Sequence, residues 1–281
     1  MIYKKYEGTN VSVIIENIDA NDPYTEVGNK AFLSCKNVAE IKLPDTISVI
    51  GDWAFAHMKG LRRIEVPAKS IAIGKDAFLD CDSLKDIIVY PDASGNPGLS
   101  ALLATCITVL KASELLDFKM SAENNDKWCE LYDSALLNYI CQADEKDFQM
   151  VIVGWFNDEA EEEQLSRHIE KTKTNKINLS FLRLKYDTYI KESTRESLVS
   201  YLRNQVGNLD SDNLSWNIIK DTISEDIQYA KVAVANSLLN ESQTLGLIKY
   251  LNDKNANPEI AAYLITSISG VEKNVEEQFA L

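Results

Sequence analysis

The stretch Ile50-Gly51-Asp52-Trp53-Ala54-Phe55-Ala56-His57-Met58 repeats a pattern found 23 residues earlier and 23 residues later in the chain. The earlier copy is Val27-Gly-Asn-Lys-Ala-Phe-Leu-Ser-Cys35, and the later copy is Ile73-Gly-Lys-Asp-Ala-Phe-Leu-Asp-Cys81. The register continues through three further apolar positions, namely Val38, Leu61 and Leu84, then Ile41, Ile64 and Ile87, and then Leu43, Val66 and Val89. A fixed period of this length indicates a solenoid of stacked coils.

Each 23-residue unit has two parts. In Arg63-Ile64-Glu65-Val66, apolar residues alternate with charged ones, which predicts a short strand with one buried face. Upstream of it, Gly51 begins a tight turn, and Ala54-Phe55 followed by Met58 predicts one inward-facing helical turn. A single unit cannot bury its apolar face, whereas stacked units can, and their strands then form a parallel sheet. We therefore expect one buried column of aromatic rings, formed by Phe32, Phe55 and Phe78.

The repeat also carries a family resemblance. The pattern Val/Ile-Gly-x-x-Ala-Phe-x-x-Cys, followed by Leu-x-x-Ile-x-Leu/Val-Pro, resembles the Treponema-type, or BspA-like, leucine-rich repeat over residues 26–91. Residues 1–25 resemble the incomplete capping unit that precedes such arrays, with Val11, Val13 and Ile15 alternating as in an edge strand. The resemblance implies a bacterial, right-handed solenoid with a protein-interaction role. Many members of the family look like secreted or surface proteins.

Beyond about Pro97 the apolar residues follow a helical period. One apolar stripe runs from Trp128 to Ile140, and a second comprises Phe148, Val151, Ile152 and Trp155. Ser193 and Glu196 form the pattern of a capping box before a helix that ends at Gly207, and Asn257-Pro258 starts a later helix. About ten helices are expected. They form either an α-solenoid of HEAT-like or ankyrin-like helix pairs or a compact helical domain.

The expected architecture is thus α+β: a short leucine-rich-repeat β-solenoid of parallel strands, followed by an all-α domain. We assign residues 1–95 to the solenoid, with an N-terminal capping strand and three 23-residue repeats, and residues 96–281 to the helical domain. The apolar run at residues 99–110 directly follows the last repeat. We expect that helix to cover the open end of the solenoid, since terminal repeats require a special covering.

The charge of the chain bears on its partners. The formal net charge is −14, which disfavours nucleic acid and anionic membranes. The helical half holds 29 of the 43 acidic residues and 18 of the 29 basic ones, so a protein partner of that half is expected to be neutral or basic. The first residues contain no apolar segment typical of a secretory signal, which favours the cytoplasm, with a surface or secreted location as the alternative that the family resemblance implies.

Few residues carry chemistry. The five cysteines lack a Cys-x-x-Cys motif and are expected to be reduced thiols, and His57 and His168 are the only histidines. Acidic residues at 158–163 fit the first turn of a helix, and residues 209–213 fit a helix cap better than a calcium loop. The sequence therefore predicts no catalytic residue, no cofactor and no metal site.

Two groups of side chains are candidates for partner binding. Trp53 and His57 occupy positions that are polar in the other repeats, so they either form an outward contact patch or pack against the helical half or a flanking side chain. On the exposed strand face lie Glu40, Lys42, Arg63, Glu65, Asp86 and Ile88, which form either a solvated ladder of charges or a docking surface. The favoured function is a non-enzymatic protein-interaction module or scaffold. The alternative is an enzyme or small-molecule sensor with a site at the junction of the two halves.

Overall fold

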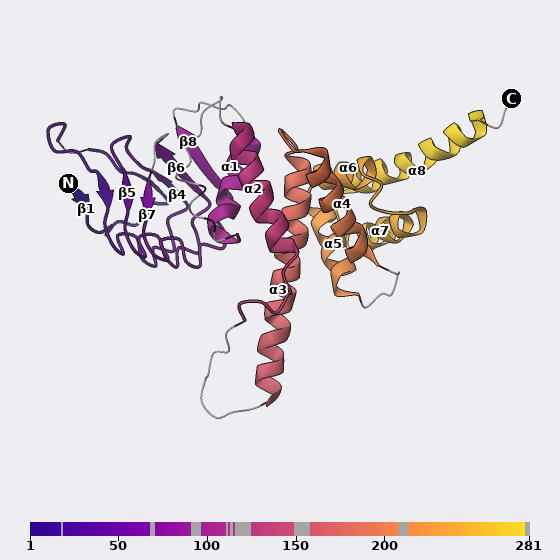
Figure 1. Cartoon of the computed structure of the whole chain (residues 1–281), viewed down its shortest axis with the longest axis horizontal. Helices are drawn as coiled ribbons and strands as arrows, with labels where there is room; N and C mark the ends of the chain where they lie inside the picture. Colours follow the sequence, from indigo (N-terminus) through magenta and orange to yellow (C-terminus); the bar gives the residue numbers. More distant parts are fainter. Residues whose placement is uncertain are drawn as a thin grey trace. The chain divides into compact units, whose positions relative to one another are not determined.

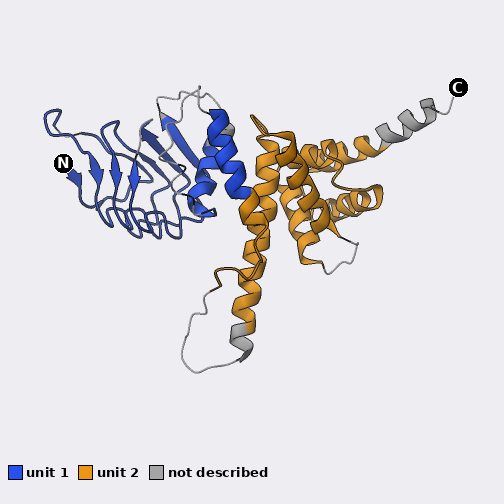
Figure 2. Ribbon diagram, in the orientation of Figure 1, with its two compact units in different colours: residues 1–136 blue, residues 137–281 orange. Residues whose placement is uncertain are grey.

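The computed structural model describes residues 1–17, 19–67, 71–90, 97–110, 112, 115, 125–148, 158–207 and 213–278. The chain forms two compact units, residues 1–136 and residues 137–281 (Figures 1 and 2). The first unit extends beyond residue 95 and includes the first helix and most of the second. The assigned boundary between residues 95 and 96 stays a prediction.

The first unit begins with a solenoid of eight short strands. These are β1 (Ile2–Tyr3), β2 (Ser12–Ile14), β3 (Glu26–Val27), β4 (Glu40–Lys42), β5 (Val49–Ile50), β6 (Arg63–Pro67), β7 (Ala72–Ile73) and β8 (Asp86–Tyr90). They form two parallel sheets with the orders β1-β3-β5-β7 and β2-β4-β6-β8. The chain therefore winds through a capping coil and three further coils, which confirms the predicted parallel solenoid (Figure 1).

The 23-residue period sets the register of the coils. Glu26 pairs with Val49 and Val49 with Ala72 in one sheet, while Ile41 pairs with Ile64 and Ile64 with Ile87 in the other. The aromatic column is also confirmed, because the ring centroids of Phe32 and Phe55 lie 5.4 Å apart and those of Phe55 and Phe78 lie 5.1 Å apart. The rings of Tyr3 and Tyr6 from the capping coil stack on Phe32 and extend the column.

The turns that join the two sheets differ from the predicted helical turn. In each coil two residues four positions apart adopt left-handed backbone angles, with φ from 51° to 60°: Lys30 and Ser34, Trp53 and His57, and Asp76 and Asp80. The Phe32 N–H donates to Ala54 O (2.7 Å) and the Phe55 N–H donates to Ala77 O (2.8 Å). The helical turn was wrong because these N–H groups bond to the next coil rather than to a carbonyl four residues back in the same coil.

The glycine that starts each turn permits close stacking of the coils. A Cβ on Gly51 would lie 2.7 Å from the Asn29 backbone nitrogen and 2.5 Å from Asn29 Oδ1, closer than side chains tolerate. This proximity lets Asn29 Oδ1 accept the Asp52 N–H (2.8 Å), and Asp52 Oδ1 accepts the Lys75 N–H (2.7 Å) in the same way. A ladder of side-chain-to-backbone bonds therefore links the three coils at this corner.

Two helices complete the first unit. Helix α1 (Pro97–Thr108) packs against β8, and its Leu102, Leu103 and Cys106 are buried. Ser100 Oγ donates to Asp86 Oδ1 (3.2 Å), which adds a polar contact between α1 and β8. The expectation that this helix covers the last coil is confirmed for these residues; Leu110 is only half-buried, and the side chain of Leu99 lies outside the described part.

Helix α2 (Asn125–Ile140) bears the predicted apolar stripe. Trp128, Tyr132 and Leu136 are fully buried, whereas Leu131 is 48% exposed. Trp128 Nε1 donates to Leu115 O (2.9 Å), and the Tyr132 hydroxyl lies 2.8 Å from Thr105 Oγ1 of α1. The contact of Tyr132 attaches α2 to α1, and the bond of Trp128 attaches it to Leu115, which follows α1 in the chain. In the second predicted stripe, Val151, Ile152 and Trp155 lie outside the described residues.

The second unit is helical. Its helices are α3 (Asp158–Lys185), α4 (Glu192–Val206), α5 (Leu214–Glu225), α6 (Ile227–Ala235), α7 (Glu241–Asp253) and α8 (Pro258–Gln278). The described residues thus contain eight helices after the solenoid, rather than about ten. Helix α3 contacts α4, α5 and α6, and α8 contacts α6 and α7. Whether these helices form a true repeat array stays a prediction.

Several predicted helix ends are found and one is wrong. Gly207 is the C-cap of α4 with φ 55°, the Asn213 side chain caps α5, and Asn257 Oδ1 accepts the Glu259 N–H (3.0 Å) at the start of α8.

Helix α4 begins at Glu192, so the capping box expected at Ser193 is not formed. A complete capping box stands instead at Asn240 and Gln243, where α7 begins.

Candidate partner-binding surface

The outer face of the β2-β4-β6-β8 sheet brings six of the eight predicted site residues together. Backbone pairing aligns Glu40 with Arg63 and Arg63 with Asp86, so these three side chains form one row across successive strands. Lys42 aligns with Glu65, and Glu65 with Ile88, which form a second row. All six are exposed or half-exposed, because they alternate with the buried residues Ile41, Ile64 and Ile87.

Opposite charges pair on this face. Glu65 Oε2 lies 3.2 Å from Lys42 Nζ of the neighbouring strand, and Glu65 Oε1 lies 3.0 Å from Nη2 of Arg63 in its own strand. The side chains of Lys42 and Arg63 remain 47% and 44% exposed. Ion pairs this open to water contribute little to stability, about 0–1 kcal/mol. The face is therefore a solvated ladder whose pairs can be exchanged at low cost.

Trp53 and His57 lie apart from these rows, on the turns that join β5 to β6. Their rings are 6.1 Å apart and both side chains are half-exposed. His57 Nδ1 lies 2.8 Å from Asp80 Oδ2 of the next coil, and Asp80 occupies the position equivalent to His57 one repeat later. Of the two interpretations, contact with a flanking side chain is thus seen for His57.

Sequence reasoning missed two partners of the candidate residues. The His57–Asp80 contact could have been found from the 23-residue offset, which stacks equivalent positions on neighbouring coils. The bond from Ser100 to Asp86 carries no such signal, because Ser100 lies in a helix outside the repeat. The sequence pattern places α1 on the last coil, but it does not identify this individual bond.

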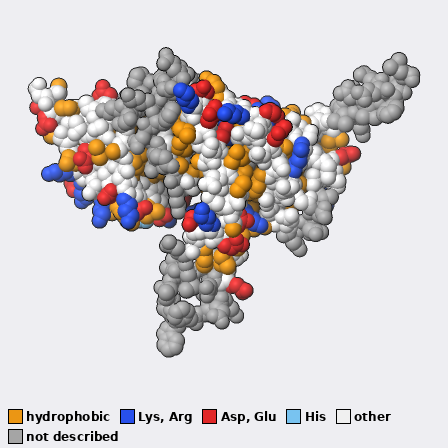
Figure 3. Space-filling view, viewed as in Figure 1, with side chains coloured by type: hydrophobic (Ala, Val, Ile, Leu, Met, Phe, Trp, Pro, Cys, Tyr) orange, Lys and Arg blue, Asp and Glu red, His pale blue; other side chains and the backbone are white. Residues whose placement is uncertain are grey.

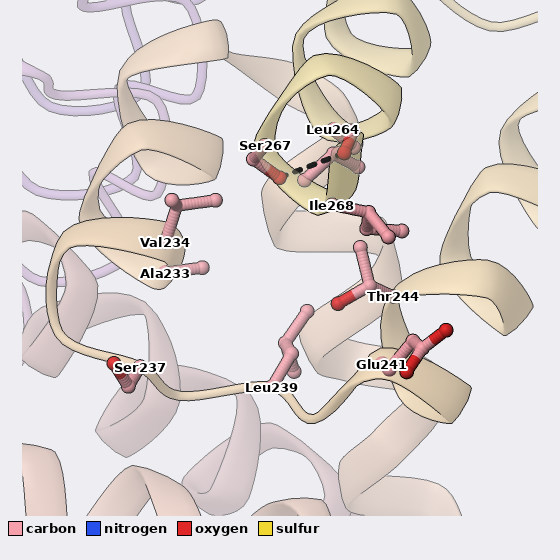
Figure 4. Close-up of a pocket in the computed structure, with 9 residues that line it drawn as sticks. All are labelled: Ala233, Val234, Ser237, Leu239, Glu241, Thr244, Leu264, Ser267 and Ile268. Atoms are coloured by element: carbon pink, nitrogen blue, oxygen red, sulfur yellow. Dashed lines mark hydrogen bonds between the residues drawn. The ribbon is translucent and has the colours of Figure 1, made fainter. Parts of the chain in front are cut away.

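A small pocket lies within the second unit, between α6, α7 and α8 (Figure 4). It has a volume of about 240 Å³ and is lined mainly by apolar atoms; its residues are Ala233, Val234, Ser237, Leu239, Glu241, Thr244, Leu264, Ser267 and Ile268. Two of its hydroxyl groups are already engaged, since Thr244 Oγ1 donates to Asn240 O (2.8 Å) and Ser267 Oγ donates to Leu264 O (2.7 Å). The lining offers few free polar groups with which to orient a cofactor.

A titratable cluster also links α5 to α7. The Tyr250 hydroxyl donates to Asp221 Oδ1, Lys254 Nζ lies 3.0 Å from the same oxygen, and Lys220 Nζ lies 4.7 Å from the centroid of the Tyr250 ring. Partial burial opposes ionisation of Asp221, but the bonds from Tyr250 and Lys254 hold its pKa below the usual value. Partial burial lowers the pKa of Lys220. The cluster acts as a polar clamp between two helices.

Within the described ranges, no group of three or more His, Cys, Asp and Glu side chains is arranged to hold a metal ion. None of the helices in the part of the chain that the structure describes combines the length and the apolarity needed to cross a bilayer.

The two parallel sheets, the 23-residue register and the aromatic column define the first unit as a leucine-rich-repeat solenoid. Residues 9–112 match the family model described as BspA type leucine rich repeat region (6 copies). The N-terminal part of the chain is therefore a BspA-like leucine-rich repeat, as the sequence resemblance predicted. Repeats of this family are in general protein-interaction modules rather than enzymes.

One solved structure is similar in sequence, a Treponema pallidum protein described as "Crystal structure of T. pallidum Leucine Rich Repeat protein (TpLRR)". Identity is 32% over 31% of this chain, with a TM-score of 0.29. The chain spans 41% of the length of that protein. Among curated proteins, none matches this chain.

Proposed function

We propose that this protein is a non-enzymatic interaction module, or scaffold, that binds a partner protein through the outer face of the β2-β4-β6-β8 sheet. The observation that carries the proposal is the arrangement of both charge signs in two aligned rows, Glu40-Arg63-Asp86 and Lys42-Glu65-Ile88. Such a pattern favours a partner whose charges complement each row, and it selects orientation and partner more than it adds affinity.

The weakness of the existing ion pairs supports this role, because charged groups of a partner can replace them. Glu65 is held by Lys42 and Arg63 in open, weak pairs, so a partner carboxylate or ammonium group can take their place with little loss of stability. Trp53 is half-exposed on the turns that join β5 to β6, and it supplies an aromatic side chain of the kind that dominates binding energy at interfaces. We assign it to the rim of the same interface, together with His57.

The partner of the acidic helical half is proposed to be neutral or basic, and nucleic acid and membranes are proposed not to be ligands. The proposed place of action is the cytoplasm, with the surface or secreted location of many relatives as the alternative. A small-molecule or catalytic site at the junction of the two halves stays a prediction without support from the described side chains.

The test is quantitative affinity capture from the native cell lysate with the full chain as bait. The swap Arg63→Glu with Glu65→Arg inverts the centre of the face without changing the net charge. The matched control is the swap Arg167→Glu with Glu163→Arg, another exposed ion pair, on α3. We expect a stoichiometric protein with the wild-type and control baits, and a roughly tenfold loss with the sheet swap. Equal recovery with all three baits would refute the proposed face.

A further inference from the structure

A second surface of the solenoid carries four basic side chains. Lys36, Lys59, Arg62 and Lys85 lie where the chain enters β4, β6 and β8, and all four side chains are exposed. We call these four residues the basic ridge. Figure 3 shows Lys and Arg side chains along the lower edge of the first unit, with Asp and Glu side chains among them.

The stacking of the coils brings these like charges together. The Arg62 N–H donates to Ala39 O (2.8 Å) and the Lys85 N–H donates to Arg62 O (2.9 Å), so Arg62 and Lys85 occupy equivalent places in successive coils. Lys36 and Lys59 are equivalent in the same sense. Gly60 allows their coils to press together, because a Cβ at that position would lie 2.2 Å from Lys36 O. Neighbouring strands in a sheet are about 4.8 Å apart.

None of the four ridge residues forms a salt bridge with another residue in the described part of the chain. The salt bridges there include Lys42, Arg63 and His57, but none of the four ridge residues. Asp82 stands at the place in the last coil that Lys36 and Lys59 occupy in the earlier two, and it ends that row. Like charges at adjacent positions of a sheet are destabilising. Binding of an external anion would relieve the repulsion between these four neighbouring cations.

We propose that the basic ridge binds a short acidic segment of a partner protein in an extended conformation. This proposal rests on the proposed function and names the chemistry of the partner. The ridge spans three coils, about 10 Å, and an extended chain advances about 3.3 Å per residue, so three or four residues cover it. The cations come from three successive coils as two pairs, Lys36 with Lys59 and Arg62 with Lys85, and several carboxylates can contact more of them than a single small anion can.

The surroundings of the basic ridge favour a short peptide over a nucleic acid. Glu40, Glu65 and Asp86 lie on the adjoining sheet face, and the whole chain carries a net charge of −14. A long polyanion would extend beyond the ridge and meet this negative surface. A segment of a few acidic residues contacts the cations alone.

The test is fluorescence anisotropy with the full-length protein and a fluorescein-labelled peptide of six glutamates, at about 20 mM and about 150 mM salt. A hexaglutamine peptide and a single-stranded oligothymidine serve as comparison probes. The ridge variant is Lys59→Gln with Arg62→Gln. The matched control is Lys127→Gln with Lys249→Gln, two exposed lysines on α2 and α7 that make no ion pair within the described residues. Circular dichroism checks that both variants are folded.

We expect hexaglutamate to bind about tenfold more tightly than hexaglutamine, with an affinity that falls at the higher salt concentration. The ridge variant should lose about tenfold in affinity while the control stays within about twofold. Equal loss in both variants, or absence of a preference for hexaglutamate, would overturn the proposal. Tighter binding of the oligothymidine through the same residues would also overturn it, in favour of a nucleic-acid site.

The two proposals can fail separately. If the ridge variant still captures the partner that the sheet swap loses, the proposed function stands and the acidic-segment proposal is wrong. If the wild-type bait captures no protein while hexaglutamate binding depends on the basic ridge, the anion chemistry stands and the proposed function is wrong.

Discussion

At the scale of single residues, the corner between the two sheets is held by side chains that imitate the backbone ladder. Asn29 Oδ1 and Asp52 Oδ1 each accept the N–H of the residue one coil further on, and the third equivalent, Lys75, ends the series because it has no acceptor oxygen. The two acceptors differ in charge but share their geometry. The position therefore selects for a short side chain with an oxygen rather than for a negative charge.

Replacement of Asp52 separates these two properties. We expect Asp52→Ala to lower the free energy of unfolding by about 0.5–1.5 kcal/mol, because the Lys75 N–H loses its acceptor. Asp52→Asn should retain most of the stability, because an asparagine, Asn29, accepts the equivalent N–H bond in the preceding coil. Urea denaturation of the three proteins measures the difference. If the asparagine variant is as unstable as the alanine variant, charge and not acceptor geometry matters here.

Cys81 makes a pH-dependent contribution to stability. Its Sγ donates to Phe55 O (3.0 Å), and burial, with smaller effects from Asp80 and Asp82, raises the pKa of the thiol from 9.0 to about 12. The neutral thiol is favoured in the folded state, so its contribution is complete below pH 9 and is lost as the pH rises towards 12. Between pH 8 and pH 10.5 the wild-type protein should therefore lose more stability than Cys81→Ala.

The check is the urea midpoint of both proteins at the two pH values, since the buried tyrosines titrate alike in both. Parallel losses would contradict the assignment. None of the five cysteines forms a disulfide in the structure, so native alkylation at neutral pH should label the exposed Cys141 first and Cys81 only on unfolding. Mass measurement after denaturation without reductant should show five labels, and three or fewer would mean that disulfides form.

At the scale of elements, two helix starts show when a local capping pattern predicts where a helix begins and when it does not. The Ser193–Glu196 pattern fits a capping box, yet α4 begins at Glu192, where Thr194 is buried and Arg195 pairs with Asp187 (2.8 Å). These contacts come from outside the pattern and set the start of the helix. At α7 the local box at Asn240 and Gln243 forms completely, and the Gln243 side chain also donates to Gly207 O (3.3 Å).

Removal of the α7 cap should be measurable. Asn240→Ala deletes the acceptor of the Gln243 N–H (2.9 Å), for which we expect a loss of about 1 kcal/mol in the free energy of unfolding. Asn252→Ala, at an exposed site near the other end of the same helix, is the control and should cost less than about 0.5 kcal/mol. Chemical denaturation of the full chain supplies both values. If both variants lost similar amounts of unfolding free energy, the Asn240 cap would not stabilise α7.

At the scale of the whole molecule, the end of the solenoid decides where the chain can be divided. Strand β8 pairs with β6 over five residues and carries α1 on its other side. Without α1, this edge and the layer of Phe78 would be open to solvent, which promotes aggregation. The structure accordingly groups α1 and most of α2 with the solenoid.

Two fragments test this division. We expect residues 1–92 to be insoluble or unfolded, because they lack the helix that buries Leu102, Leu103 and Cys106 against the rest of the unit. Residues 1–140, which include all of α2, should be soluble and melt cooperatively. Gel filtration and circular dichroism distinguish the outcomes. A soluble, monomeric, cooperatively melting 1–92 fragment would instead support a domain that ends near residue 95.

The sequence by itself determined the coil period, the parallel sheet β2-β4-β6-β8 and the buried column of Phe32, Phe55 and Phe78, but not the second sheet. It could do so because every unit repeats the same local pattern, and an equal spacing of units fixes which residues stack. It also indicated which strand residues face outward, since alternation along a strand separates its two faces.

Only the tertiary structure decided how the side chains at those positions meet. The left-handed turns arise because the N–H groups of Phe32 and Phe55 bond to the next coil, a partner that no local pattern contains. The net charge is one value for the whole chain, and it favours a neutral or basic partner. The stacking of the coils instead determines which charged side chains are neighbours. On the sheet face, Glu65 pairs with Lys42 and Arg63; on the basic ridge, Lys36, Lys59, Arg62 and Lys85 lie on neighbouring coils.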